Sequence, residues 1–156
     1  MNRMKADPKD WKIRLATVED AAGLEACMHA AYRDYEPRMN GQVLPPMILD
    51  YAAEIRDIPT WVLEFESVIV GGLSMRFEVD TAILANIAVS PEFQGQGAGR
   101  GLMDFAQNQA RNKGFKEMRL ATHVLLSETI SLYAHLGWAE YDRDESRVYF
   151  KKVISI

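Results

Sequence analysis

The chain has 156 residues, of which 48% are apolar, and a formal net charge of −4 from 22 acidic and 18 basic side chains. This length predicts a single domain over residues 1–156, and the acidic balance argues against nucleic acid as a partner, because a polyanionic backbone is bound through basic patches. With no window of 18 apolar residues and no apolar stretch of signal-peptide length at the N-terminus, we expect a cytoplasmic protein without a membrane partner. Cys27 is the only cysteine, which excludes an intrachain disulfide and a cysteine-rich metal site, and we expect no metal.

The first half of the chain predicts strands and two helices. Residues 11–16 alternate as a short strand does, and Thr17 followed by Asp20 is typical of a capping box that begins a helix. A second helix should end before Pro59, and Gly71-Gly72 indicates a bulge or a close backbone approach. The predicted elements of this half are a strand over 11–16, a helix after Thr17, a loop over 37–46, a helix over 47–56, and strands over 61–65, 68–77 and 79–89.

The second half predicts a strand, helix and strand in succession, which places the two strands parallel with a right-handed crossover. The first of these strands ends in a glycine loop, and the helix should end near Lys113-Gly114. Ser127 is expected to cap a last helix that Gly137 closes. The other predicted elements are strands over 118–122, 138–141 and 147–153. Antiparallel strands followed by one late crossover predict a mixed α+β sheet with helices on both faces.

The segment from Asn86 to Arg100 has the composition of a phosphate-binding loop. Glycines 95, 97 and 99 precede a predicted helix, whose unpaired N–H groups and partial positive charge attract anions. A Walker loop would end in Gly-Lys-Ser/Thr, whereas Gly99 is followed by Arg100, and no register of these glycines fits the Rossmann pattern. The loop therefore predicts a phosphorylated cofactor of another kind.

The loop Gln94-Gly95-Gln96-Gly97-Ala98-Gly99 closely resembles the Q/R-x-x-G-x-G/A pyrophosphate loop of the Gcn5-related N-acetyltransferase (GNAT) superfamily. Ile87-Ala88-Val89 resembles the fourth strand of that family, and Leu132-Tyr133 with Gly137-Trp138 resembles its Leu-Tyr-x-x-x-Gly-aromatic motif. The resemblance covers residues 79–141. It implies a mostly antiparallel central sheet of about six to seven strands with one parallel crossover, and an N-acetyltransferase that uses acetyl-CoA (coenzyme A).

Three further segments are similar to a bacterial subgroup of this superfamily whose substrates are largely unassigned. They are Tyr32-x-x-Tyr35-x-x-Arg38-Met39, Pro46-Met47-x-x-Asp50-Tyr51, and Thr122-His123 with Glu128. The chain departs from the subgroup at Thr129 and His123, where asparagine is usual or frequent. Leu126 stands where many superfamily members have an asparagine, which places any cofactor contact from that side chain in doubt.

The resemblance also implies which residues bind acetyl-CoA. Backbone amides of residues 94–99 would hold the pyrophosphate, and residues 87–89 would run beside the pantetheine arm with a main-chain N–H, such as that of Val89, facing the thioester oxygen. Arg100 either adds charge at a phosphate or is a solvated arginine at the helix start, and Glu128 either orients the cofactor or caps its helix. The predicted cofactor-binding residues are Ile87, Ala88, Val89, Gln94, Gly95, Gln96, Gly97, Ala98, Gly99, Arg100 and Glu128.

The resemblance assigns Tyr133 as the catalytic general acid, although its helical spacing also suits a core residue. The chemistry permits the assignment, since a phenol with a pKa of about 10 can protonate an alkylthiolate of pKa about 8.5 or higher. The general base stays open between Glu78, Asp80, His123 and an ordered water.

Tyr32, Tyr35 and Arg38 are the predicted substrate-binding residues, because this region lines the acceptor pocket in the superfamily. An Arg38 that faces the pocket would favour an acceptor with a carboxylate. The leading hypothesis is an acetyl-CoA-dependent N-acetyltransferase acting on a primary amine of a small molecule or amino-acid-like acceptor. The alternatives are a protein or peptide N-acetyltransferase and a non-catalytic acyl-CoA-binding sensor. A homodimer is possible, because dimers are common in the superfamily.

Overall fold

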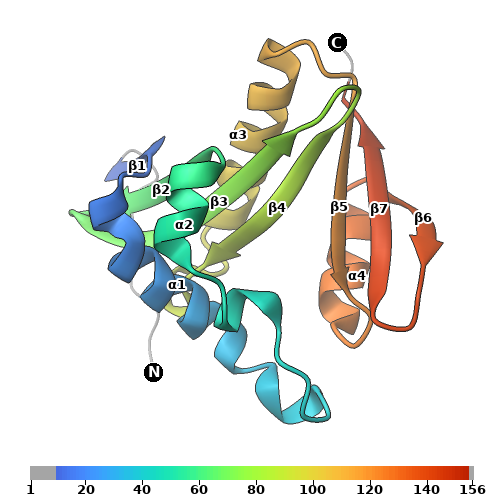
Figure 1. Ribbon diagram of the computed structural model, residues 1–156, viewed down its shortest axis with the longest axis horizontal. Helices are drawn as coiled ribbons and strands as arrows, with labels where there is room; N and C mark the ends of the chain where they lie inside the picture. The colour runs from blue at the N-terminus through green and yellow to red at the C-terminus, as the bar shows by residue number, and fades with distance from the viewer. Residues whose placement is uncertain (1–9, 155–156) are drawn as a thin grey trace.

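The computed structural model describes residues 10–154, in which seven strands form one sheet in the order β1-β2-β3-β4-β5-β7-β6 (Figure 1). Neighbouring strands are antiparallel except β4 and β5, which are parallel. The strands are β1 (Trp11–Leu15), β2 (Thr60–Phe65), β3 (Val68–Phe77), β4 (Ala82–Val89), β5 (Glu117–His123), β6 (Ala139–Arg143) and β7 (Arg147–Val153). The main helices are α1 (Ala21–Arg33), α2 (Tyr51–Asp57), α3 (Ala98–Asn112) and α4 (Ser127–His135). The mixed α+β fold and the single parallel crossover expected from the sequence are confirmed.

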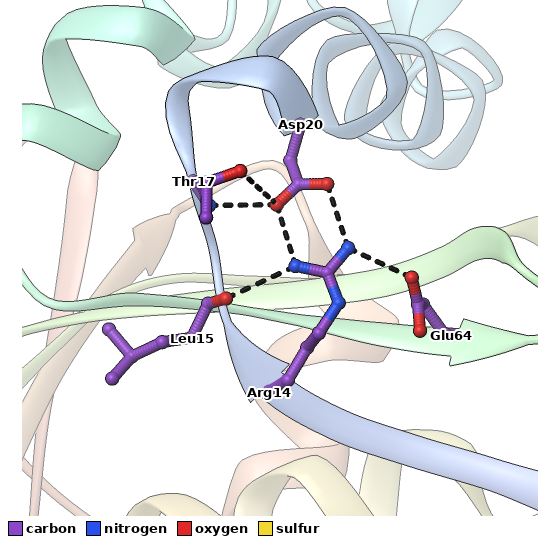
Figure 2. Close-up of polar contacts among 5 residues, drawn as sticks. All are labelled: Arg14, Leu15, Thr17, Asp20 and Glu64. Carbon is purple, nitrogen blue, oxygen red and sulfur yellow. Dashed lines mark hydrogen bonds and ion pairs between the residues drawn. The ribbon is translucent and has the colours of Figure 1, made fainter.

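The connection from β1 to α1 is fixed by a charged cluster (Figure 2). The predicted capping box is present, since the Asp20 carboxylate accepts the backbone N–H of Thr17 at 2.7 Å, although the chain first forms a 3₁₀ turn, η2 (Val18–Asp20). The Arg14 guanidinium donates to both Asp20 oxygens at 2.8 Å and to Glu64 of β2 at 2.8 Å. Arg14 holds the pKa of Asp20 near 2, because its hydrogen bonds favour the ionised carboxylate.

Helices α1 and α2 cover one face of the sheet (Figure 1). The close backbone approach predicted at Gly71-Gly72 is confirmed: a Cβ on Gly72 would lie 2.5 Å from Cδ1 of Leu24 in α1. The helix expected over 47–56 begins later, at Tyr51, because Asp50 is its N-cap and accepts the N–H of Ala53 at 3.1 Å.

Helices α3 and α4 pack against the other face of the sheet. Leu102 and Ala106 of α3 are buried there, and Tyr133 of α4 packs partly buried against the same core. Ser127 was expected to cap α4, and this expectation is wrong, because Ser127 is already the first helical residue and Leu126 occupies the cap. Among residues 10–154, no helix has the length and apolar character needed to span a membrane.

Strands β4 and β5 pair only at their starts. Their Cα partners are Ala82 with Met118 and Ile83 with Arg119, and beyond these the two strands diverge, as Figure 1 shows. A register shift opposite Ser74 of β3 places an extra residue, Ala85, in β4 at the point of divergence. The rest of β4 therefore keeps β3 as a neighbour on one side, and on the other side it pairs with no strand of residues 10–154.

The segment between α1 and α2, residues 34–50, crosses from the α1 side of the molecule to the β5 side. It contains two 3₁₀ turns, η3 (Glu36–Arg38) and η4 (Pro45–Met47). Its Met39 and Leu44 are buried against Leu126, which precedes α4. The segment thus joins the two halves of the sheet near the end where β4 and β5 diverge.

Candidate functional site

At the edge of β4 that faces away from β3, beyond its pairing with β5, no other strand of residues 10–154 bonds the backbone. The N–H of Ser90 donates to Val70 of β3 at 2.8 Å, so Asn86 and Ala88, in phase with Ser90, also direct their N–H and C=O groups toward β3. Ile87 and Val89 therefore direct theirs away from β3, toward the side that β5 has left. In the part of the chain that the structure describes, neither of these two N–H groups finds an acceptor.

Both outward carbonyls of this edge are held by side chains. The Tyr32 hydroxyl donates to the C=O of Ile87 at 3.1 Å, and the Gln94 amide donates to the C=O of Val89 at 3.1 Å. Tyr32 comes from α1, whereas Gln94 begins the glycine loop after β4. The edge is thus fixed at one point by the predicted substrate region and at the other by the predicted cofactor loop.

The glycine loop leads directly into α3. Gly95 and Gly97 have φ values of 80° and 88°, a left-handed conformation that a side chain would strain. The first intrahelical bond runs from the N–H of Gly101 to the C=O of Gly97 at 2.9 Å, so the N–H groups of Ala98, Gly99 and Arg100 have no acceptor within the helix.

The space over this helix start is open, because a Cβ built on Gly97 or Gly101 would meet no atom within 4 Å. Gly99 is also exposed, and its Cβ would reach only Val89, at 3.8 Å. Arg100 is exposed in the first turn. Free N–H groups, an open approach and a nearby cation are together typical of an anion-binding helix start.

Tyr133 lies on α4 with its ring against Trp138 at 6.1 Å and Phe150 at 5.9 Å between ring centroids. No group within residues 10–154 forms a hydrogen bond with its hydroxyl. Burial raises the pKa of Tyr133 to about 12, with a smaller contribution from Tyr35. The phenol is therefore protonated at neutral pH and has a proton to donate.

The predicted substrate residues lie beside Tyr133. Rings of Tyr32 and Tyr35 are 6.0 Å apart, and the Arg38 guanidinium lies 4.8 Å from the centroid of Tyr35. Burial raises the pKa of Tyr32, with Tyr133 as the next contributor, which indicates that these two phenols are neighbours. The structure thus gathers Tyr32, Tyr35, Arg38 and Tyr133 at one end of the molecule.

Arg38 and Glu128 form a bidentate ion pair between η3 and α4. Arg38 Nη1 donates to Glu128 Oε2 at 2.9 Å, and Nη2 donates to Oε1. The guanidinium lowers the pKa of Glu128, and the helix-start N–H of Glu128 itself contributes. A residue expected to bind substrate is thus paired with one expected either to orient the cofactor or to cap α4, and Glu128 lies in the first turn of α4.

The general-base candidates lie in two different places. Glu78 and Asp80 belong to the hairpin between β3 and β4, at the end where β4 and β5 are paired. Asp80 is seven residues from Ile87, roughly 20 Å along a strand. His123 lies at the opposite end of β5 and accepts the N–H of Leu125 on Nδ1 at 3.1 Å, which leaves Nε2 to donate to Gln42 at 3.0 Å.

Glu54 is a residue that the sequence did not single out. It lies on α2, partly buried, and its Oε1 accepts the Ser74 hydroxyl at 2.9 Å and the Asn86 amide at 3.4 Å. Its partners are 20 and 32 residues away in the chain. No local spacing could have predicted this contact, because it depends on how α2 packs over β3 and β4.

Comparisons with known proteins agree with this geometry. Residues 24–138 match the model of the acetyltransferase (GNAT) family. The chain is 37% identical over 143 residues, 86% of each chain, to the uncharacterized N-acetyltransferase YjgM of Escherichia coli K12. It is 36% identical over 62 residues, 40% of this chain and 42% of the relative, to the ribosomal protein bS18-alanine N-acetyltransferase of the same strain. The PaiA N-acetyltransferase of Thermoplasma acidophilum in complex with coenzyme A has a similar fold, with a TM-score of 0.74 and 21% identity over 92% of this chain and 98% of that one.

Proposed function

The chain belongs to the acetyltransferase (GNAT) family, and from this premise we propose that it is an acetyl-CoA-dependent N-acetyltransferase. The acceptor in this proposal is a primary amine of a small molecule or an amino-acid-like compound. One observation carries the proposal: within residues 10–154, β4 has an unpaired edge with outward N–H groups at Ile87 and Val89, and this edge leads through the glycine loop to the open start of α3.

The donor side would be bound by backbone groups. N–H groups of residues 98–100 would hold the pyrophosphate, and the outward N–H groups of Ile87 and Val89 would bond the pantetheine arm as a further strand bonds a sheet edge, with Ala88 between them. Val89 is next to the glycine loop, whereas Ile87 is held by Tyr32, a neighbour of Tyr133. We therefore assign the N–H of Ile87 to the thioester oxygen and that of Val89 to the arm.

Acetyl-CoA supplies a thioester carbonyl that an amine can attack. The N–H of Ile87 would stabilise the negative charge that develops on the carbonyl oxygen, since a preorganised donor is most effective where charge appears. Tyr133, protonated at neutral pH, would donate its phenolic hydrogen to the sulfur that leaves. The protein thus positions the two reactants, supplies one N–H donor to the oxyanion and supplies one proton to the sulfur.

Arg38 does not by itself select a carboxylate acceptor. Its guanidinium is already engaged by both oxygens of Glu128, so an acceptor carboxylate would have to replace that partner. Tyr32 and Tyr35 offer aromatic surface beside the pair. We propose that these two rings contact the acceptor and that the Arg38–Glu128 ion pair holds the rings in position.

The test is a thiol-release assay with acetyl-CoA against amines, amino acids, polyamines and peptides. We expect release that depends on a primary amine, with acetylation of its nitrogen verified by mass spectrometry. Acetyl-CoA binding without release across the panel would reject the transferase and support an acyl-CoA-binding sensor.

A second candidate is N-acetylation of a peptide or protein, favoured by the local similarity to the bS18-alanine N-acetyltransferase. The two are separated by one comparison within the same assay. A peptide acetyltransferase would prefer an alanine-starting peptide to free alanine by kcat/KM, whereas an enzyme for small amines would show the reverse preference.

A further inference from the structure

We propose that Glu54 binds the ammonium group of the acceptor and accepts its proton before the amine attacks. This inference rests on the proposed acetyl transfer and assigns the general base. It concerns a side chain on α2, outside the candidates that the sequence offered.

The Glu54 carboxylate is oriented by two neutral donors on the same oxygen. Ser74 of β3 and Asn86 of β4 both donate to Oε1, and Ser74 is buried. Within residues 10–154, Oε2 accepts no hydrogen bond. One oxygen is therefore fixed, and the other is available to a ligand from the partly exposed side of the residue.

Within residues 10–154, the negative charge of Glu54 has no counter-ion. No Lys, Arg or His of residues 10–154 has a nitrogen within 4 Å of it. The partly buried carboxylates of Asp20 and Glu64, by contrast, share Arg14. Because a carboxylate partly removed from water is normally paired, an unpaired one in a reactive region indicates a site for a cation.

Glu54 also lies at the reacting end of β4. Its partner Asn86 directly precedes Ile87 in β4. The Asn86 side chain that bonds the Glu54 carboxylate therefore belongs to the residue next to the Ile87 N–H. Asn86 lies directly opposite Ser74, next to the register shift at Ala85 where the strand separates from β5. The anchor of Glu54 is therefore next to the proposed oxyanion donor.

The base and the acid approach this point from different sides. Glu54 reaches the sheet from α2, on the face that α1 also covers, whereas Tyr133 packs with the core of the opposite face. An amine bound by Glu54 would attack the thioester carbon from one side, while the Tyr133 phenol would donate its hydrogen to the sulfur from the other side. This arrangement assigns deprotonation of the ammonium group to Glu54 and protonation of the sulfur to Tyr133.

The protons balance in this scheme. An R–NH₃⁺ acceptor transfers one proton to Glu54 Oε2, and the neutral nitrogen forms a bond with the thioester carbon. The carbon–sulfur bond then breaks, sulfur takes the phenolic hydrogen of Tyr133, and the phenolate takes the excess proton of the nitrogen. Glu54 passes its proton to water, so the products are the acetamide, coenzyme A thiol and one proton.

Glu54→Gln tests the assignment without disturbing the anchor. The amide oxygen can still accept from Ser74 and Asn86, but an NH₂ donor replaces the free oxygen. With the amine that gives the fastest thiol release in wild type, we expect kcat/KM to fall by about 100-fold. Acetyl-CoA affinity by calorimetry should stay within about twofold, because the donor side does not include Glu54.

Asp57→Asn is the matched control, since it removes one exposed carboxylate from the same helix and should leave kcat/KM unchanged. Glu54→Ala should regain activity when formate is added, because formate restores a carboxylate in the space that the side chain leaves. A Glu54→Gln enzyme within threefold of wild type would overturn the assignment and leave the acetyl transfer standing. A wild type that binds acetyl-CoA and releases no thiol with any amine would overturn both.

Discussion

Replacing Tyr133 with phenylalanine removes one hydroxyl and leaves the packing of the ring in place. The contacts with Trp138 and Phe150 are ring contacts, which phenylalanine retains. The hydroxyl has no hydrogen-bond partner within residues 10–154, so its removal breaks no bond of the folded protein. We expect the free energy of unfolding to change by less than about 1 kcal/mol.

The effect on turnover should be much larger. Burial raises the pKa of Tyr133 to about 12, which makes the phenol a weaker acid than an alkylthiol of pKa about 8.5. Complete transfer to a free thiolate would be uphill by roughly 5 kcal/mol, so the phenol should release its hydrogen to sulfur only while it regains one from the nitrogen. General acids contribute about 10²–10⁴-fold, and a weak one belongs at the lower limit. We therefore expect kcat to fall by about 100-fold, or about 2.7 kcal/mol of activation free energy.

The measurement is kcat by thiol release, beside acetyl-CoA affinity and urea unfolding. Tyr141→Phe is the control, since Tyr141 is an exposed tyrosine on β6. In wild type, Tyr133 should cause no loss of kcat below about pH 11, because a phenol with a pKa of about 12 is still protonated there. Unchanged kcat in the phenylalanine variant would refute the role of Tyr133, and so would an equal fall in acetyl-CoA affinity.

Three further substitutions test the loop, the helix contact and the charged cluster. Gly97→Val should weaken acetyl-CoA binding by about tenfold or more. The control Gly114→Val, at a similar φ of 87° just after α3, should bind acetyl-CoA normally. Equal acetyl-CoA binding by both variants would reject the loop assignment. Gly72→Ala should lower the free energy of unfolding by about 1–3 kcal/mol in urea, because its Cβ would lie 2.5 Å from Leu24, and an unchanged midpoint would show that α1 shifts freely. Asp20 has a pKa near 2 in the folded protein against an ordinary 3.8, so wild type should lose stability as the pH falls from about 4 to 2. Asp20→Asn should be less stable than wild type at pH 6, and its melting temperature should approach that of wild type near pH 2; a constant difference would contradict the ion-pair explanation.

Periodic segments of the sequence predicted the fold well. Strands expected over 61–65 and 68–77 were found within one residue, because a two-residue turn and alternating apolar positions define them. Two errors concern helix starts, and a third concerns a strand, because the strand expected over 79–89 begins only at Ala82. Tyr51 begins α2 four residues later than expected, after a 3₁₀ turn, and Ser127 lies inside α4. Such starts depend on the dihedral angles of one or two residues, which apolar periodicity does not encode.

The candidate site was predictable only where it is local in sequence. Residues 94–97 lie between the 3₁₀ turn after β4 and the start of α3, and residues 98–99 begin that helix, so composition alone located a glycine loop at a helix start. The Arg38–Glu128 pair joins residues 90 apart, and His123 meets Gln42 across 81 residues. Both contacts arise because residues 34–50 fold back over the α4 side, and no spacing within one element reports such an arrangement.

Ala85 has a consequence for how this edge could change. Along a regular strand, adjacent residues alternate in the direction of their backbone groups, and one inserted residue reverses that phase for everything after it. Ala85 is this inserted residue in β4. Because of it, the backbone N–H and C=O groups of Ile87 and Val89, rather than those of Asn86 and Ala88, face away from β3. Deleting this one alanine would exchange the two sets without altering any side chain of the glycine loop or of Tyr133. The number of residues in β4, and not only their identity, therefore determines which N–H groups the edge presents.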